Sequence, residues 1–475
     1  MPAMTQPPHI LYILSDEHRG QAMSHAGDPN LRTPWMDRLA SEGVSFQRAY
    51  ANCPICTPSR GTIFSGRHAH AGPVAGFFDV YKAAAPSVAT VLRDGGYHTA
   101  YFGKWHCGIN WNQTPPGAKL VWSQYSVEGQ PHRTPEHHRA GFQDWFAFEI
   151  NNHPFDGKYY HQRELTPRTL PGYQTDALTD LVIDYLKAYA REGPLFLVLS
   201  VEPPHFPLDA PERFRRFDPA RLQVRPNFTE TPKMREHLAM YYAMIENLDW
   251  NIGRLMEALA GLPRFRNTLT VVFSDHGDYM GSHGLFNRKE LPHEESVRIP
   301  AIFHWPGQVP ARGTIPGLFS LVDLMATTLG LAGAPIPPWN QGLDFSPHMR
   351  GQSFRPPEAV LLEMVGSPRW SLEMPDWRGL VTEQYKYAFY ETGEEILFDL
   401  QNDPFEMRNI AAGQPQVLGA LRQQLIRALA ASREPFFDVL IEHGAKPAEP
   451  IHDVSTGKSR PLSSIKGYAE PGRNA

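Results

Sequence analysis

The stretch HILYILSDEH, residues 9–18, joins an uninterrupted apolar run to a polar, acidic end. An apolar run of this length that stops at Ser15 and Asp16 predicts a short buried strand. PLFLVLSV (residues 194–201) and LTVVFSDHGD (residues 269–278) have the same form. Because apolar strands without alternation are typical of sheets covered on both faces, the three runs predict a mostly parallel sheet.

Helical patterns separate these runs. In QTDALTDLVIDYLKAYA (residues 174–190) and in the longer segment 235–259, apolar residues recur every three or four positions. Strands that alternate with helices are typical of α/β proteins. The sequence therefore predicts an α/β fold with a large, mostly parallel central sheet flanked by helices.

The pattern changes after the Pro-rich break GAPIPPWN (residues 333–340). Short apolar runs follow, and two of them, YKYAFY and EILFDL, flank a turn at Gly393, which predicts an antiparallel hairpin. The segment 416–432 then has a helical pattern. We therefore expect a smaller C-terminal α+β subdomain that carries an antiparallel sheet.

We expect the chain to have three parts. A first domain covers residues 1–340, and within it residues 109–171 form an insertion of loops that suits substrate contacts. The α+β subdomain covers residues 341–445, and residues 446–475 form an extended tail rich in Pro, Gly and Ser. The tail would suit contact with a second copy of the chain, so a homo-oligomer is an open alternative.

Composition and charge exclude several classes of protein. Of the 475 residues, 41% are hydrophobic and 20% charged, which fits a folded globular chain, and the net charge of −5 argues against nucleic-acid binding. No apolar run approaches a membrane span, and the run at residues 10–14 is too short for a signal peptide. Three cysteines cannot form a disulfide framework. These observations predict a cytoplasmic protein without nucleic-acid or membrane partners.

Acidic side chains and one imidazole follow two of the predicted strands. Asp16 and Glu17 come after the first run, and Asp275 and His276 come after the last. In open α/β sheets ligands bind at the carboxyl ends of strands, so these side chains can converge. Carboxylates together with an imidazole suit a divalent cation such as Ca²⁺ or Mn²⁺. A capping or loop carboxylate is the alternative for any one residue, but the two groups together favour a metal site.

The segment CPICTPSR, residues 53–60, contains two of the three cysteines. A CxxC pair suits a redox motif, half of a zinc site or a chance arrangement, and the pair alone leaves these alternatives open. Pro58 predicts the start of a helix that continues through TIFSGRHAH (residues 62–70). A side chain just ahead of a helix N-terminus faces free N–H groups, which suits an anion.

Several ordered motifs resemble those of one enzyme family. Cys56-Thr57-Pro58-Ser59-Arg60 matches the C-x-P-S-R signature of the type I sulfatases. These are the formylglycine-dependent members of the alkaline phosphatase superfamily, and they include phosphonate monoester hydrolase-like enzymes. Further similar segments, in chain order, are YFGKWHCG (101–108), PPHFP (203–207), FSDHGDYMGSHGLFNRK (273–289), HEESVRIPAIFHWPG (293–307) and LFDLQNDPFEMRNIA (397–411). The resemblance runs from about residue 9 to about residue 430 and implies an alkaline phosphatase-like fold.

The resemblance implies that Cys56 is oxidised after translation to formylglycine by a formylglycine-generating or equivalent maturation enzyme. The aldehyde adds water, and one hydroxyl of the diol, bound to the metal, attacks the sulfur and expels the alcohol. The other hydroxyl then loses its proton, the C–O bond to the sulfate group breaks, and sulfate leaves as the aldehyde forms again. One metal ion, Ca²⁺ or alternatively Mn²⁺, lowers the pKa of the attacking hydroxyl.

The same resemblance implies a set of metal ligands. Asp16, Asp275 and His276 match ligand positions, and residue Cys56 contributes the formylglycine oxygen. Glu17 matches the adjacent ligand position, where the family usually has Asp. Because Glu is longer by one methylene, Glu17 would bind in a different geometry or act from outside the set of direct ligands.

Five further side chains take roles in the implied reaction. Arg60 would hold the formylglycine oxygen, and Lys104 and Lys289 would neutralise the sulfate oxygens. His106 would take the diol proton, and His205 would contact and protonate the leaving oxygen. A solvated surface lysine and a loop-ordering histidine are the alternatives for Lys289 and His205. Their positions within matching motifs favour the catalytic roles.

We therefore expect a sulfatase that hydrolyses a small-molecule organic sulfate ester to an alcohol and inorganic sulfate. The first alternative is a phosphonate monoester or phosphodiester hydrolase that uses the same formylglycine and metal site. The second is a non-catalytic metal-binding protein in which Cys56 stays a thiol. The alcohol part of the substrate is not predicted.

Overall fold

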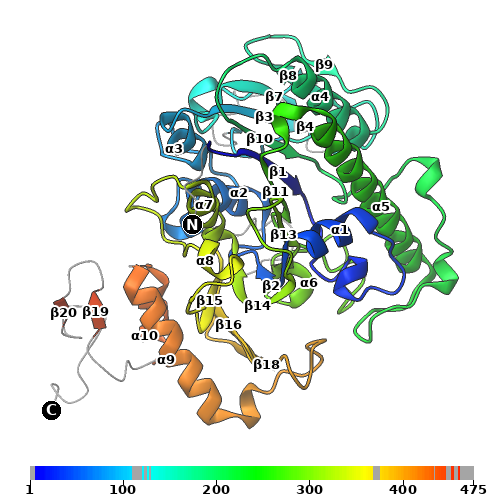
Figure 1. The fold of residues 1–475 in the computed structure, drawn as a ribbon. Coiled ribbons are helices and arrows are strands. Elements are labelled where there is room, and N and C mark those ends of the chain that lie inside the picture. The colour runs from blue at the N-terminus through cyan, green and yellow to red at the C-terminus, as the bar shows by residue number, and fades with distance from the viewer. Residues whose placement is uncertain are drawn as a thin grey trace, which may run out of the picture. The chain divides into compact units, whose positions relative to one another are not determined.

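The computed structural model describes residues 6–109, 120–121, 126–127, 130–366, 375–432, 434–444, 451–453 and 458–460 (Figure 1). The chain divides into two compact units, Met1–Pro356 and Pro357–Ala475. The first unit holds a large mixed sheet, and the second holds a four-stranded antiparallel sheet.

Eleven strands form the large sheet of the first unit. In sheet order they are β12 (Arg298–Ile299), β2 (Val44–Tyr50), β13 (Ala301–His304), β11 (Thr268–Ser274), β1 (His9–Ser15), β10 (Leu195–Ser200), β3 (His98–Lys104), β7 (Asp144–Phe148), β8 (Lys158–His161) and β9 (Arg168–Thr169), with β14 (Gly313–Ser320) paired to β2. Three short strands, β4 (Leu120–Val121), β5 (Ser126–Val127) and β6 (Gln130–Pro131), form a separate sheet.

The central strands of the large sheet run parallel. β1 pairs in parallel with β10 on one side and with β11 on the other, and β3 and β7 extend the parallel block. β13 and β12 pair antiparallel with their neighbours, whereas β14 pairs in parallel with β2. The predicted large, mostly parallel central sheet is therefore confirmed.

Most helices of the first unit lie between these strands in the chain, and the last two follow β14. The helices are α1 (Pro34–Glu42), α2 (Cys56–Ser65), α3 (Val88–Asp94), α4 (Gln174–Ala188), α5 (Pro232–Gly261), α6 (Glu294–Val297), α7 (Leu321–Ala332) and α8 (Ser346–Met349). α4 and α5 confirm the two helices predicted from their apolar periodicity. Within the described part of the chain, no helix has the length and apolar character needed to cross a membrane.

Both faces of the large sheet are covered, and strand β1 shows why. Ile10, Tyr12 and Leu14 belong to one core, which also contains residues of α2, α3 and α7. Leu11 and Ile13 belong to a second core, which contains residues of α1, α4 and α5. Because successive side chains of a strand point to opposite faces, a strand that is apolar at every position needs a layer on each side. Figure 1 shows helices on both sides of the sheet.

Helix α2 differs from the sequence prediction at both ends. It begins at Cys56, so residue 56 is the first residue of the helix and does not precede it. It ends at Ser65 because Gly66 adopts the left-handed conformation, with φ 62°, which terminates a helix. The prediction of one continuous helix through residue 70 was therefore wrong: residues 66–68 are not helical, and Ala69–Ala71 form a separate 3-10 helix.

The segment 109–171 also departs from the prediction of an insertion of loops. Residues 144–148 form β7, which pairs in parallel with β3, and β8 and β9 continue the sheet from it. The prediction was wrong for these strands. These three strands are two to five residues long, and β7 is only partly apolar. None of them is long enough to show the apolar pattern that predicts a strand. Residues 110–119 lie outside the described part of the chain.

The second unit is built on a small antiparallel sheet. Its strands are β15 (Ala359–Met364), β16 (Trp377–Thr382), β17 (Tyr385–Tyr390) and β18 (Glu395–Asp399), and its helices are α9 (Pro415–Ser432) and α10 (Phe436–Glu442). β17 and β18 pair antiparallel, which confirms the predicted hairpin. Of the predicted tail, the structure describes only the paired strands β19 (Ile451–Asp453) and β20 (Lys458–Arg460). Phe345 and Met349, which lie after the predicted boundary at residue 340, belong to the core of the first unit.

Candidate active site

Polar side chains gather where the central parallel strands end. Asp16 follows β1, Asp275 and His276 follow β11, and Ser200 and Lys104 are the last residues of β10 and β3. These four strands are neighbours in the sheet, in the order β11, β1, β10, β3. Because parallel strands end at the same edge, their terminal side chains meet in one place.

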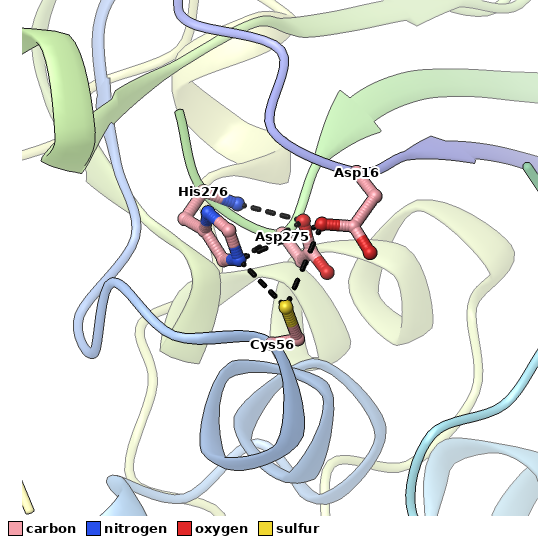
Figure 2. Close-up of side chains that lie close together, drawn as sticks. All are labelled: Asp16, Cys56, Asp275 and His276. Carbon is pink, nitrogen blue, oxygen red and sulfur yellow. Dashed lines mark hydrogen bonds and ion pairs between the residues drawn. The ribbon is translucent and has the colours of Figure 1, made fainter. Parts of the chain in front are cut away.

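Four of the predicted residues form a fully buried cluster (Figure 2). One ligand atom from each of Asp16, Cys56, Asp275 and His276 lies within 4.8 Å of the others. The Cys56 Sγ lies 3.1 Å from Nε2 of His276 and 3.7 Å from Oδ1 of Asp16. Figure 2 shows the cysteine reaching up from the start of α2 toward the side chains that follow β1 and β11.

Arg60 connects this cluster to the sheet. It lies one turn along α2 from Cys56, and its Nε donates to Oδ2 of Asp275 at 3.0 Å. Its Nη2 lies 3.4 Å from Oδ2 of Asp16, and its Nη1 donates to the Lys104 carbonyl and to Oγ of Ser200. The guanidinium therefore holds the ends of four strands in one arrangement.

The end of β3 requires a glycine next to the predicted lysine. Gly103 has φ 97°, and a Cβ there would lie 1.8 Å from the carbonyl oxygen of Ser200. Only glycine fits such a contact in this conformation. The close approach of the two strands brings Nζ of Lys104 to 2.5 Å from Oδ2 of Asp16.

The two buried aspartates have opposite pKa shifts. Burial acts to raise the pKa of Asp16, but the charge of Lys104, together with Arg60, outweighs burial and holds this pKa well below its usual value. Burial, followed by the negative charge of Asp16, raises the pKa of Asp275. The positive charge of Arg60, which pairs with Asp275, does not cancel these two effects.

The Cys56 side chain is held as a thiol by its surroundings. Burial raises its pKa far above the usual range, and the neighbouring Asp16 carboxylate raises it further. The charges of Lys289 and Lys104 oppose this shift without cancelling it. Because a thiolate, not a thiol, is the nucleophile of cysteine chemistry, the raised pKa disfavours attack by an unmodified Cys56.

Glu17 lies beside the cluster but faces a different set of partners. Its backbone is in the left-handed region, with φ 64°. Lys289 Nζ donates to Glu17 Oε1, and Nε2 of His205 lies 3.3 Å from the same oxygen. Glu17 Oε2 is buried and has no hydrogen-bond partner among the described residues. Glu17, Asp16 and His205 form a second group whose ligand atoms lie within 4.8 Å of one another.

The two predicted catalytic histidines are both held neutral. His205 Nδ1 donates to the carbonyl of Phe206, which leaves Nε2 as the acceptor, 3.4 Å from Nζ of Lys289. Burial, followed by the charges of Lys104 and Lys289, lowers the pKa of His205 well below its usual value. Burial, followed by Lys104, does the same to the pKa of His106. A neutral imidazole is the form that accepts a proton.

The donor set fits a divalent cation of the hard or borderline kind. Two carboxylates, an imidazole nitrogen and the side chain of residue 56 converge within 4.8 Å. A nearby cation would stabilise the ionised form of Asp275, whose pKa is raised. It would also give the unpaired Oε2 of Glu17 a partner. Oxygen ligands with one nitrogen suit Ca²⁺ or Mn²⁺ better than the soft metals that thiolates select.

Two polar residues of the site were missed by the sequence analysis. Ser200, which accepts from Arg60, ends a predicted strand, so the rule that placed Asp16 at a strand end would also have found it. Asp278 is buried near Glu17 and Lys289, and burial raises its pKa to about 6. It lies three residues after Asp275, within a motif already quoted, but nothing in its spacing marks it as buried.

The three cysteines are all free and buried. Cys107 Sγ donates to the carbonyl of Thr57, on the helix that carries Cys56. No disulfide joins Cys53 and Cys56.

Two family models match the chain. The model described as Sulfatase matches residues 8–334, which is more than half of the chain. The model described as N-sulphoglucosamine sulphohydrolase, C-terminal, matches residues 281–434. The two matches together span residues 8–434.

Curated relatives match along most of their length. The Ulvan-active sulfatase of Formosa agariphila is 31% identical over 485 residues, which cover 96% of this chain and 89% of that protein. The Endo-4-O-sulfatase of Bacteroides thetaiotaomicron is 28% identical over 495 residues, which cover 90% of this chain and 93% of that protein.

Solved structures have the same fold. The protein yidJ of Bacteroides fragilis, described as a sulfatase, superposes with a TM-score of 0.82 at 28% identity and covers 92% of this chain and 99% of its own. The phosphonate monoester hydrolase of Agrobacterium radiobacter superposes with a TM-score of 0.69 at 22% identity, covering 90% of this chain and 96% of its own. The second match shows the shared fold alone.

Proposed function

The chain belongs to the sulfatase family and is a sulfuric ester hydrolase, and on this premise we propose that it cleaves its ester at the buried cluster around Cys56. The observation that carries this proposal is the convergence of residue 56, two carboxylates and an imidazole at the ends of parallel strands. The product would be an alcohol and inorganic sulfate.

In this proposal Cys56 is the precursor of formylglycine. The thiol itself is buried and protonated, so a conversion is needed before residue 56 can supply a nucleophile. Formylglycine, once hydrated, supplies a hydroxyl group that attacks sulfur and a second hydroxyl that allows sulfate to leave by elimination. A formylglycine-generating or equivalent maturation enzyme is therefore the expected partner.

Asp16, Asp275 and His276 would hold one divalent metal together with residue 56. Ca²⁺ suits this mixed oxygen and nitrogen set best, and Mn²⁺ is the alternative. Glu17 could contribute only its unpaired Oε2, because Oε1 is held by Lys289. When bound, the metal would lower the pKa of the hydroxyl at residue 56 and neutralise sulfuryl oxygens.

The remaining charged side chains of the site would stabilise negative charge on the sulfate and on residue 56. Lys104 pairs with Asp16, and Lys289 contacts Glu17 and His205, so both would neutralise the oxygens of the sulfate. The guanidinium of Arg60 binds Asp16 and Asp275, which lie next to residue 56 in the cluster. Arg60 would therefore hold the oxygen at residue 56. Fixed positive groups in a buried site stabilise charge that develops in the transition state.

The two histidines would act as proton acceptor and proton donor. His106, held neutral, would accept the proton from residue 56 in the elimination step. His205 would contact the leaving oxygen. The negative charge of a bound sulfate ester raises the pKa of a nearby imidazole, which would enable His205 to carry a proton to that oxygen. A cytoplasmic location and a homo-oligomeric state stay predictions.

Parallel steady-state assays would test the function. We expect kcat/KM for an aryl sulfate to exceed kcat/KM for the matched aryl phosphonate. Cys56→Ala should abolish turnover and leave the thermal melting temperature close to that of wild type, because the role of residue 56 is chemical. Fragmentation mass spectrometry of the tryptic peptide AYANCPICTPSR would show whether position 56 is thiol, aldehyde or hydrate. A preference for the phosphonate, or turnover by Cys56→Ala, would contradict the proposal.

A further inference from the structure

Glu149 is a buried carboxylate that the proposed reaction does not use. It follows β7 directly and is only 2% exposed. Its Oε2 accepts a hydrogen bond from the backbone N–H of Gly108 at 3.0 Å, and its Oε1 accepts one from the hydroxyl of Thr134. Because a buried carboxylate is costly unless it is hydrogen-bonded, both contacts matter to its place in the fold. Gly108 lies two residues after His106, the proposed proton acceptor.

The backbone at His106 has a conformation that its surroundings must hold. Its φ is 55°, in the left-handed region that residues with a side chain rarely adopt. Hydrogen bonds fix the chain on both sides of it. The Trp105 N–H donates to the carbonyl of Phe148 at 2.7 Å, and the carbonyl of Cys107 accepts from the Tyr81 N–H at 2.7 Å. A strained conformation of this kind persists only where neighbouring contacts over-determine it.

Glu149 fixes the next residue of this segment, and the contact is close. A Cβ on Gly108 would lie 2.3 Å from Oε1 of Glu149 and 2.6 Å from Cγ2 of Thr134, so only glycine fits there without a shift. The carbonyl of Gly108 lies 3.2 Å from Nε2 of His132. The charge of Arg60 acts to lower the pKa of Glu149, which places this carboxylate within electrostatic reach of the four-residue cluster.

We infer that Glu149 is a positioning residue that acts through the backbone of Gly108 and holds His106 where it accepts the proton of the elimination step. This inference rests on the proposed function. In that step His106 takes the proton of the second hydroxyl, whose O–H electron pair forms the C=O bond. The C–O bond to the sulfate group breaks, and sulfate leaves with that bond's electron pair. The alcohol has already left. Loss of Glu149 therefore slows the second half of the reaction and spares the first.

Rapid-mixing kinetics with 4-nitrophenyl sulfate would separate the two halves of the reaction. Assays at pH 8 keep Glu149 ionised, because burial raises its pKa to about 7. Each variant is normalised to its content of formylglycine, counted by peptide mass spectrometry. We expect Glu149→Ala to release one equivalent of 4-nitrophenol as fast as wild type does in its first turnover. Steady-state turnover should then be about 100-fold slower than in wild type, the cost of a catalytic group displaced by about 1 Å.

Two matched variants separate positioning from folding. Glu149→Gln keeps an oxygen that accepts from the Gly108 N–H, so its kcat should stay within about 5-fold of wild type. Gly108→Ala keeps Glu149 but places a methyl group against its carboxylate, and it should show the same burst and slow turnover as Glu149→Ala. This variant decides the matter if Glu149→Ala does not fold. A melting curve for each variant shows which of them fold.

Hydrogen–deuterium exchange, followed by mass spectrometry, tests the contact without turnover. Exchange at the Gly108 N–H should be about 10-fold faster in Glu149→Ala than in wild type and unchanged in Glu149→Gln. Equal slowing of both halves of the reaction, wild-type turnover in Glu149→Ala, or unchanged exchange in that variant would overturn the inference. If wild type releases no 4-nitrophenol, the proposed function fails, and the exchange rates still decide whether Glu149 holds this segment.

Discussion

At the scale of single residues, Lys104 shows how the cluster keeps its charge. Burial acts to lower the pKa of Lys104, but the nearby Asp16 carboxylate outweighs burial and raises it. The ammonium group therefore stays charged although its side chain is only 1% exposed. A buried, permanently charged group interacts more strongly with a bound anion than a solvated one does.

We predict that Lys104→Ala lowers kcat by about 100-fold, the usual cost of losing one charge-stabilising group in an active site. Steady-state kinetics on an aryl sulfate would measure it. Lys158→Ala is a suitable control because Lys158 is exposed at the start of β8. An unchanged kcat would rule out the proposed role of Lys104. A melting curve for each variant would separate loss of chemistry from loss of folding.

The residues of the cluster were predictable to different degrees. Asp16, Asp275 and His276 follow apolar runs, so their meeting follows from strand ends alone. The contact of Glu17 with Lys289 joins residues 272 positions apart, and no strand pattern brings them together. Such contacts are set by tertiary packing and leave no period in the sequence.

At the scale of elements, the contact between α1 and α5 depends on a buried carboxylate. Asp249 of α5 accepts hydrogen bonds from the backbone N–H groups of Trp35 and Met36, in the first turn of α1. These N–H groups have no partner within their own helix. Burial raises the pKa of Asp249 to about 7, despite the hydrogen bonds that lower it.

We predict that Asp249 makes the protein less stable as pH rises from about 4 to about 7. In this range the folded chain holds a proton on Asp249 that the unfolded chain has lost, so the free energy of unfolding falls. Asp249→Asn carries no titrating group. Denaturant unfolding from pH 5 to pH 8 should show that the variant loses about 2–3 kcal/mol less stability than wild type.

Asp249→Ala provides the matched control for this experiment. It also removes the titrating group, but it leaves the two N–H groups of α1 without their acceptor. We expect the same reduced pH response as for Asp249→Asn, at a lower stability throughout. Equal pH slopes for wild type and Asp249→Asn would contradict the raised pKa.

The elements themselves were predictable where their apolar periods are long. β1, β10 and β11 are apolar at nearly every position, and α5 repeats its apolar face over 30 residues. β7 was missed because five residues are too few to show a period. The end of α2 was misplaced because the left-handed Gly66 breaks a helix that local composition would continue.

At the scale of the whole molecule, the buried carboxylates predict that a metal ion stabilises the fold. Chelation should lower the melting temperature of wild type, and Ca²⁺ should restore it. An ion at 100 times its dissociation constant adds about 2.7 kcal/mol to the free energy of unfolding. Differential scanning fluorimetry with Ca²⁺, Mn²⁺ and Mg²⁺ in turn would rank the ions without any need for turnover.

Asp275→Asn is the matched variant for the chelation experiment. It keeps the shape of the side chain and removes one of the two carboxylate charges of the four-residue cluster. Its melting temperature should respond much less to Ca²⁺ than that of wild type. A wild-type melting temperature that none of the ions changes would contradict the metal site.

The burial of α2 has a consequence for the order of events in biosynthesis. All ten residues of this helix are buried, and Cys56 is its first residue. An enzyme that oxidises Cys56 must therefore meet the segment while the chain is still emerging from the ribosome or has not yet packed. Under the proposed function, a chain that folds before this encounter would keep a thiol at residue 56 and stay inactive, and later addition of the enzyme would not rescue it. For this protein, timing during synthesis would set the active fraction.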